Sequence, residues 1–375
     1  MKKYSLSLSI LIFIFILSGC KLQTNSSDWR GVWITNVDSK VLDSKESIDE
    51  AMKFLADHGF NVVMPVVWND AYTLYPSKIM KDTFDREISP RFKNRDPLEE
   101  LIISAHEHGL QVVAWFEYGF ASSYNKKGGA LLEKKPEWAA KDIDGNLLKK
   151  NNFEWMNAYM PEVQDFIISL VMEVVKNYDV DGVQGDDRLP AQPSHGGYSD
   201  FTVKLYQSEN GGLLPPEDFR DKDWMKWRGD KLNAFAKRLY DTVKAENKNV
   251  LVTWAPSVYP WCYEEYLQDW PEWIRGGYAD VVIPQVYRYN IDAYEITLNE
   301  LDSIKEKLKD YKTPILPGVL LNVGKYVMED DFLLETIKMN RHHNYKGEVF
   351  FFYEGLRKKM NRTAKLIAPI YKGEE

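Results

Sequence analysis

The chain has 375 residues, of which 44% are hydrophobic and 28% charged, and its formal net charge is −8. This length suits one large domain with a substantial core. The acidic balance and the lack of basic runs interleaved with aromatic residues argue against a nucleic-acid partner. The 12 Trp and 22 Tyr residues suit a sugar-binding cleft, although many of these rings must belong to the core.

Residues 1–19 are expected to be a lipoprotein signal peptide. Lys2 and Lys3 precede an apolar run, Ile10–Leu17, that is too short for a comfortable membrane span. Leu17-Ser18-Gly19-Cys20 then resembles a bacterial lipobox. A simple signal peptide or an uncleaved anchor is the alternative.

The lipobox resemblance implies cleavage before Cys20 and lipidation of its thiol. We therefore expect a protein anchored to a bacterial membrane outside the cytoplasm, and Lys21 favours the outer membrane if the cell is Gram-negative. Residues 20–28 are short and polar, and we expect them to form a tether. Residues 29–375 then form a single domain.

Eight apolar runs follow in the chain, and their continuous apolar character is typical of strands buried on both faces. The runs are Trp29–Thr35, Asn61–Trp68, Gln111–Tyr118, Gly182–Asp186, Val250–Trp254, Asp280–Tyr287, Pro314–Asn322 and Gly347–Glu354.

Amphipathic stretches between the runs predict helices. They are Ser47–Gly59, Pro97–Gly109, Met160–Tyr178, Lys226–Asn247, Ala293–Leu308, Asp330–His343 and Lys358–Tyr371. The alternation of strands and helices predicts an α/β fold, a (β/α)8 TIM barrel. A doubly wound open sheet is the alternative, but it usually carries a glycine-rich phosphate loop, and none is present.

Two connections in this pattern are long. Gly119–Tyr159 follows the third predicted strand and Arg188–Trp224 follows the fourth. Both leave from the carboxyl ends of strands, where the active-site loops of a barrel grow. We expect these long loops to form the walls of a cleft.

Four acids fall near the carboxyl ends of predicted strands and are the candidate catalytic residues. They are Glu117 on the third strand, Asp186 and Asp187 on the fourth, and Glu354 on the eighth. Hydrolysis of a glycosidic bond needs two carboxyl groups, of which one donates a proton and the other attacks the sugar or activates water. A structural ion pair with Arg188, a helix cap or a metal site is the alternative interpretation.

Rings, amides and an arginine occupy the ends of most predicted strands, and such groups suit a polyhydroxylated ligand. For any one of them, hydrogen bonding within the barrel rim is an equal possibility. The candidate substrate-binding residues are Trp33, Asn36, Trp68, Asn69, Tyr72, Tyr118, Arg188, Trp254, Gln285, Tyr287 and Asn322.

The histidines do not indicate a metal site. His106 and His108 lie two residues apart in a predicted helix and so point to different faces. His342 and His343 are expected to end another helix, where they complement its dipole. We expect neither a metal nor another cofactor.

Four stretches resemble the glycosyl-hydrolase-like family 10, a bacterial group once known only as a domain of unknown function. They are Arg30–Asn36, Val66–Ser77, Ala114–Gly119 and Asp181–Arg188. The resemblance implies a TIM-barrel glycosidase, and some lipoproteins that look like this act on peptidoglycan glycan strands stripped of peptides.

The fourth strand also looks like two wider patterns. By its similarity to the α-amylase family, Asp186 would be the nucleophile. In chitinase-type hydrolases the strand ends in a Glu, but here Arg188 takes that position and Gln184 replaces an inner Asp. Substrate-assisted catalysis by the chitinase route is therefore not expected.

These patterns together predict a surface-anchored glycoside hydrolase. Asp186 or Asp187 would act as nucleophile or base, and Glu117 or Glu354 as proton donor, while Arg188 holds one Asp ionised. The substrate is expected to be a polysaccharide, most plausibly the glycan strands of peptidoglycan. A lipoprotein that binds glycan without cleaving it is the alternative.

Overall fold

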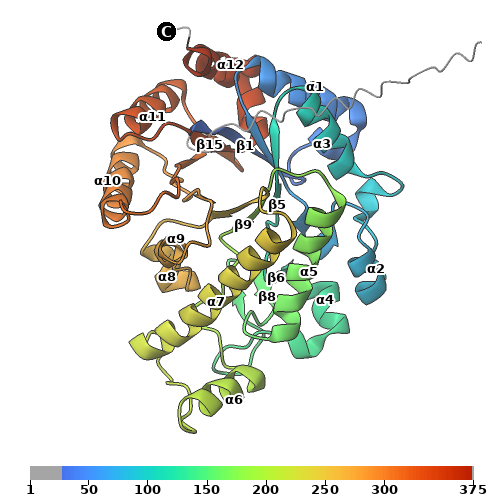
Figure 1. Cartoon of the computed structure of the whole chain (residues 1–375), viewed down its shortest axis with the longest axis vertical. Helices are drawn as coiled ribbons and strands as arrows, with labels where there is room; N and C mark the ends of the chain where they lie inside the picture. The colour runs from blue at the N-terminus through green and yellow to red at the C-terminus, as the bar shows by residue number, and fades with distance from the viewer. Residues whose placement is uncertain (1–27, 374–375) are drawn as a thin grey trace, which may run out of the picture.

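The computed structural model describes residues 28–373 (Figure 1). The predicted signal peptide, the Cys20 lipidation site and the tether up to residue 27 lie outside the described residues. Within residues 28–373, no helix is long and apolar enough to cross a membrane.

Eight parallel strands form the centre of the fold, as the predicted (β/α)8 barrel requires. They are β1 (Arg30–Ile34), β2 (Val62–Pro65), β5 (Gln111–Trp115), β9 (Gly182–Asp186), β10 (Leu251–Ala255), β11 (Val281–Val282), β12 (Gly318–Leu320) and β15 (Glu348–Phe351). Their hydrogen-bonded order is β11-β10-β9-β5-β2-β1-β15-β12.

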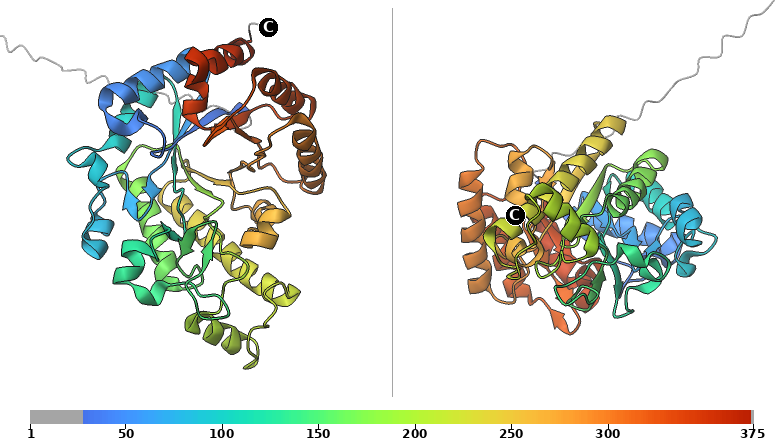
Figure 2. Two further views of the ribbon diagram at one scale, coloured as in Figure 1. Left: turned by 180° about the vertical axis from the view of Figure 1, so that it is seen from behind. Right: turned by 90° about the horizontal axis from the view of Figure 1, so that it is seen from below.

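The two end strands of this sheet also meet. Parallel bridges join Val282 to Ile315 and Gln285 to Gly318, so the sheet curls round until β11 and the segment of β12 are neighbours. Helices cover the outside of the sheet (Figure 2). The residues of the strands are buried almost throughout, as expected of a barrel whose centre is packed with side chains.

The helices lie mainly between successive barrel strands (Figure 1). They are α1 (Lys45–Asp57), α2 (Lys78–Phe84), α3 (Pro97–Glu107), α4 (Gly129–Lys134), α5 (Pro161–Asn177), α6 (Asp200–Glu209), α7 (Lys222–Glu246), α8 (Trp261–Tyr266), α9 (Trp270–Arg275), α10 (Ile291–Lys307), α11 (Asp330–His342) and α12 (Tyr353–Lys372).

Local signals place the starts of several helices. Ser44 and Ser47 form a reciprocal capping box at the start of α1, each side chain bonding the other's backbone N–H at 3.0 Å. Pro97 and Pro161 occupy the first turns of α3 and α5, where their fixed φ suits the helix and the missing N–H costs nothing.

The long loops contain secondary structure that the sequence pattern does not predict. The loop after β5 folds into the small antiparallel sheet β6 (Ala121–Tyr124), β8 (Phe153–Trp155) and β7 (Lys149–Lys150). Two short hairpins, β3 (Trp68–Asn69) with β4 (Tyr72–Thr73) and β13 (Asn322–Val323) with β14 (Tyr326–Val327), follow β2 and β12.

The predicted eighth strand is too long by several residues. Strand β15 ends at Phe351, and Glu354 lies in the first turn of α12 rather than on a strand. A carboxylate is favoured there because the N-terminus of a helix carries partial positive charge. Helix α12 itself is broken at Lys358–Asn361, where the backbone leaves helical geometry, before it resumes through Tyr371.

Candidate active site

A cavity of about 200 Å³ opens at the carboxyl end of the barrel strands. Its walls come from β1, β5, β9 and β15 and from the segments that follow β5, β9 and β11. The lining residues are Trp33, Trp115, Glu117, Asp186, Asp187, Arg188, Gln285, Tyr287 and Phe351. Seven of the fifteen catalytic and substrate-binding candidates predicted from the sequence therefore meet at this cavity, among them three of the four acids.

Arg188 is the electrostatic centre of this cavity. Its Nη1 lies 2.9 Å from Asp187, and its Nη2 lies 3.2 Å from Asp186 and 3.5 Å from Glu117. The Nε of Arg188 also donates to the backbone oxygen of Glu117 at 2.8 Å. One guanidinium thus faces three carboxyl groups, so it cannot form a full ion pair with each of them.

Asp186 is the most deeply placed of the three acids, with a side chain only 2% exposed. Its Oδ2 accepts a hydrogen bond from Trp115 Nε1 at 3.0 Å, and its Oδ1 accepts one from the backbone N–H of Arg188 at 3.0 Å. Burial raises the pKa of Asp186 well above its usual range, with Asp187 and Glu117 adding to the rise, while Arg188 opposes it.

Glu117 follows β5 and lies nearer the opening, with 16% of its side chain exposed. Asn69, in the β3–β4 hairpin, donates to its Oε2 at 2.5 Å. Burial raises the pKa of Glu117, and nearby Asp187 adds to the rise, whereas Arg188 and Asn69 lower it. A raised pKa keeps part of the Glu117 population protonated, which is what a proton donor requires.

The floor of the cavity is a polar layer inside the barrel. Trp33 Nε1 donates to Gln184 Oε1 at 2.6 Å, and Gln184 Nε2 donates to Thr253 Oγ1 at 3.1 Å. The three residues come from β1, β9 and β10. This chain of bonds satisfies a buried amide and fixes the Trp33 ring that lines the site.

A glycine allows the loops that follow β5 and β9 to touch. Gly119 has φ +49°, and a Cβ there would lie only 2.2 Å from the backbone oxygen of Arg188. The next residue, Phe120, uses its N–H to bond that same oxygen at 3.0 Å. A side chain at position 119 would therefore push Arg188 out of place.

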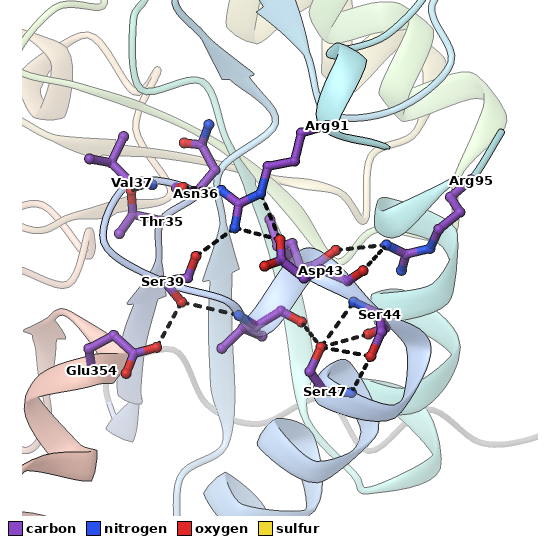
Figure 3. A network of polar contacts seen from close by, with 12 residues as sticks. Thr35, Asn36, Val37, Ser39, Asp43, Ser44, Ser47, Arg91, Arg95 and Glu354 are labelled. Carbon is purple, nitrogen blue, oxygen red and sulfur yellow. Dashed lines mark hydrogen bonds and ion pairs between the residues drawn. The ribbon is translucent and has the colours of Figure 1, made fainter. Parts of the chain in front are cut away.

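The structure does not bring Glu354 or Asn36 to the cavity, since neither lines it. The Glu354 carboxylate accepts a hydrogen bond from Ser39 Oγ at 2.9 Å (Figure 3). The loop that carries Asn36 and Ser39 is held by Arg91, which donates to both backbone oxygens and pairs with Asp43. These contacts fix the loop between β1 and α1.

Three of the predicted substrate-binding residues, Trp68, Trp254 and Tyr72, instead contact other parts of the protein. Trp68 Nε1 donates to the backbone oxygen of Gly119 at 3.1 Å, and Trp254 Nε1 donates to that of Tyr278 at 3.0 Å. Tyr72 packs under the guanidinium of Arg86, 4.6 Å from the ring centre. All three lie outside the cavity lining.

Two other predicted residues, Tyr118 and Asn322, are buried and do not line the cavity. Tyr118 is buried, and the guanidinium of Arg188 lies 5.9 Å from its ring centre. Asn322 is buried after β12, and its Oδ1 has no hydrogen-bond partner among the described residues.

Two residues that line the cavity, Trp115 and Phe351, were not predicted from the sequence. Trp115 ends β5 and Phe351 ends β15, so each occupies a strand end like the residues that were predicted. Trp115 precedes Glu117 by two positions, the spacing that puts side chains on the same side of an extended chain. That spacing is the signal that could have identified Trp115.

Across residues 28–373, the acids, histidines and cysteine form no group of three or more that could hold a metal ion. What the cavity offers chemically is three carboxyl groups, one arginine and aromatic walls.

The sequence of this chain matches a known protein family. Residues 28–328 match the family described as Glycosyl hydrolase-like 10. The chain belongs to this family. The match covers the barrel from before β1 to the β13–β14 hairpin and so includes all the residues that line the cavity except Phe351.

Relatives carry names that agree with the family. The chain is 25% identical over 308 residues to "Glycosyl hydrolase DigH" of Escherichia coli (strain K12), covering 71% of this chain and 66% of that protein. It is 27% identical over 324 residues to "Glycosyl hydrolase YngK" of Bacillus subtilis (strain 168), covering 77% and 60%. The chain thus spans slightly less than two thirds of these relatives.

Solved structures with the same fold are glycosidase domains. The PgaB (BpsB) glycoside hydrolase domain from Bordetella bronchiseptica aligns with a TM-score of 0.66 at 14% identity, over 90% of this chain and 98% of that one. The catalytic domain of a beta-amylase from Paenibacillus polymyxa aligns with a TM-score of 0.64 at 11% identity, over 93% and 99%. At these identities the likeness establishes the barrel fold alone.

Proposed function

We propose that this protein is a glycoside hydrolase that cleaves the glycan strands of peptidoglycan. The observation that carries the hydrolase proposal is the meeting of Glu117, Asp186 and Asp187 around Arg188 in an aromatic-walled cavity. Membership of the glycosyl-hydrolase-like family supports it. The peptidoglycan substrate rests on the sequence resemblance and on the expected anchor at Cys20 outside the cytoplasm.

In this proposal the acids divide the work according to their surroundings. Glu117, with a raised pKa and a partly open position, donates a proton to the leaving oxygen. The second role needs an ionised carboxylate, which attacks the sugar carbon or activates water. Asp186 or Asp187 takes it, and Arg188 favours the ionised form of Asp186 against the effect of burial. One nitrogen of Arg188 lies 3.5 Å from Glu117 and 3.2 Å from Asp186, so these two carboxyl groups are close enough to act on one glycosidic bond.

The aromatic walls have a role of their own. Trp33, Trp115 and Phe351 pack against one another, with ring centres 6.2 to 6.4 Å apart. Their apolar faces exclude water around the carboxyl groups and offer stacking surfaces for the C–H faces of a sugar.

The test is to incubate the protein with peptide-free peptidoglycan strands and with a panel of plain glucans, and to identify products by mass spectrometry. We expect new reducing ends from the wall glycan. Asp186→Asn should lower kcat on the order of a thousandfold or more, because it removes a reacting carboxylate or its immediate partner.

Glu354→Gln is the matched control, since it neutralises an acid of the same barrel end that faces Ser39 rather than the cavity. This variant should keep its turnover. Full activity in Asp186→Asn would contradict the assignment of the site. Retained glycan binding with no cleavage of any substrate would instead support a non-catalytic glycan-binding lipoprotein.

A further inference from the structure

A second cavity of about 470 Å³ lies on the same rim of the barrel as the candidate active site. We call it the tyrosine groove and define it by Tyr289, Tyr326, Phe332, Glu329, Asp331 and Glu335. It lies where α10 and α11, which pack against each other, begin (Figure 1).

The chain connects this groove directly to the active site. The segment after β11 brings Gln285 and Tyr287 to the catalytic cavity and, two residues later, Tyr289 to the groove. Tyr326 belongs to β14, which follows the carboxyl end of β12. Connections that leave the carboxyl ends of parallel strands emerge on one rim, so a long ligand on that rim has access to both cavities.

The groove presents an open aromatic platform. Tyr289 is 62% exposed, and its ring meets that of Tyr326 edge to face, at 4.8 Å and 88°. This contact orients the exposed ring. The hydroxyl oxygen of Tyr326 is buried and has no hydrogen-bond partner within the part of the chain that the structure describes, so the surface that the groove offers to a ligand is the exposed Tyr289 ring.

The charged side chains that line the groove are all acidic. Glu329, Asp331 and Glu335 line it, and neither a Lys nor an Arg does so among the described residues. Lys359 approaches Glu329 at 3.2 Å and Lys338 approaches Glu335 at 3.7 Å, both outside the lining. Carboxylates accept hydrogen bonds from sugar hydroxyls but repel an anionic ligand.

We infer that the tyrosine groove is a remote subsite for an uncharged sugar unit of the glycan whose cleavage is proposed above, and the inference rests on that proposed function. The sugar stacks on Tyr289, and its hydroxyls donate to the carboxylates of the groove. In a strand that alternates uncharged N-acetylglucosamine with carboxylate-bearing N-acetylmuramic acid, the groove selects the uncharged unit and so sets the position of the strand in the active site.

The experiment measures binding of a hexamer of β-1,4-linked N-acetylglucosamine by titration calorimetry. The full chain carries Asp186→Asn so that the hexamer is not consumed. Adding Tyr289→Ala should weaken the affinity about tenfold, the scale of one lost aromatic contact. Adding Tyr311→Ala, which removes another exposed tyrosine that lies outside both cavities, should leave the affinity unchanged.

A second probe tests the charge of the groove. A carboxymethylated hexamer should bind more weakly than the neutral one, and this difference should shrink in Asp331→Asn combined with Glu335→Gln. Equal affinity of the neutral hexamer with and without Tyr289→Ala, or no binding of it at all, would overturn the inference. If the unaltered protein cleaves no glycan but the Tyr289 effect persists, the proposed hydrolase function fails while the sugar site stands.

Discussion

Strand β15 begins and ends in two very different surroundings for buried acids. At its start, the fully buried Glu348 accepts paired hydrogen bonds from Arg341, at 2.8 and 2.9 Å, and others from Asn340 and Tyr371. At its end, Phe351 faces a cavity in which three carboxyl groups share Arg188.

The difference lies in how completely each charge is satisfied. Glu348 has one arginine to itself and further donors on both oxygens, so it stabilises the fold. Asp186 and Glu117 compete for one guanidinium, and their pKa values rise because burial is incompletely compensated. The fold therefore carries a satisfied acid at the closed end of the barrel and less fully satisfied acids at the open end, where the proposed reaction would take place.

The largest effect that would test this comparison is on stability at the closed end. Glu348→Ala should lower the free energy of unfolding by about 3 kcal/mol, because it leaves Arg341 without its carboxylate and strips Asn340 and Tyr371 of an acceptor. Urea denaturation measures this, while kcat of the folded protein should not change. Asp165→Ala, which breaks the exposed pair with Arg238, is the control and should cost under about 1 kcal/mol.

At the open end the corresponding effect should fall on turnover. Glu117→Gln should lower kcat about a hundredfold, because the amide cannot donate the proton that the leaving oxygen needs. The raised pKa of Glu117 also predicts how activity depends on pH. Because the protonated form is the donor, the activity of the unaltered protein should fall as pH rises through that pKa. The variant should lose this alkaline limb in a pH–rate profile, and an unchanged limb would assign it to another group.

The smallest effect concerns how stability depends on pH. Because the folded-state pKa of Asp186 is raised, its burial penalty is complete above that pKa and vanishes below the ordinary Asp value of about 3.9. Asp186→Asn should therefore unfold at higher temperature than the unaltered protein at pH 8, and this advantage should shrink as the pH falls toward 4. A variant less stable at pH 8 would show that its hydrogen bonds to Trp115 and Arg188 outweigh the penalty.

Most of the barrel strands and most of the residues that line the cavity could be predicted from the sequence. Continuous apolar runs place the eight strands because parallel strands are buried on both faces, and the acids at the ends of β5 and β9 stand out because buried charge is rare. Glu354 was misplaced for a physical reason. The apolar run of β15 continues through Phe352 and Tyr353, and only the backbone turn at the strand end shows that Glu354 begins a helix.

Other parts of the site could not be predicted, because they depend on contacts between residues that are far apart in the sequence. The bond from Trp115 to Asp186 joins positions on different strands, and the meeting of Tyr289 with Tyr326 depends on a hairpin too short to leave a periodic pattern. Similarly, nothing near Gly119 in the sequence indicates that its lack of a side chain makes room for Arg188.

That contact also bears on how the site would be re-engineered. The loops after β5 and β9 are the longest in the fold, and they meet backbone to backbone where Gly119 lies under the Arg188 carbonyl and Phe120 bonds it. A designer who grafts one loop from a homologue without the other would separate the arginine from the acids. The two loops must therefore be exchanged together, and the junctions of a chimera should lie in β5 and β9, the strands that precede them.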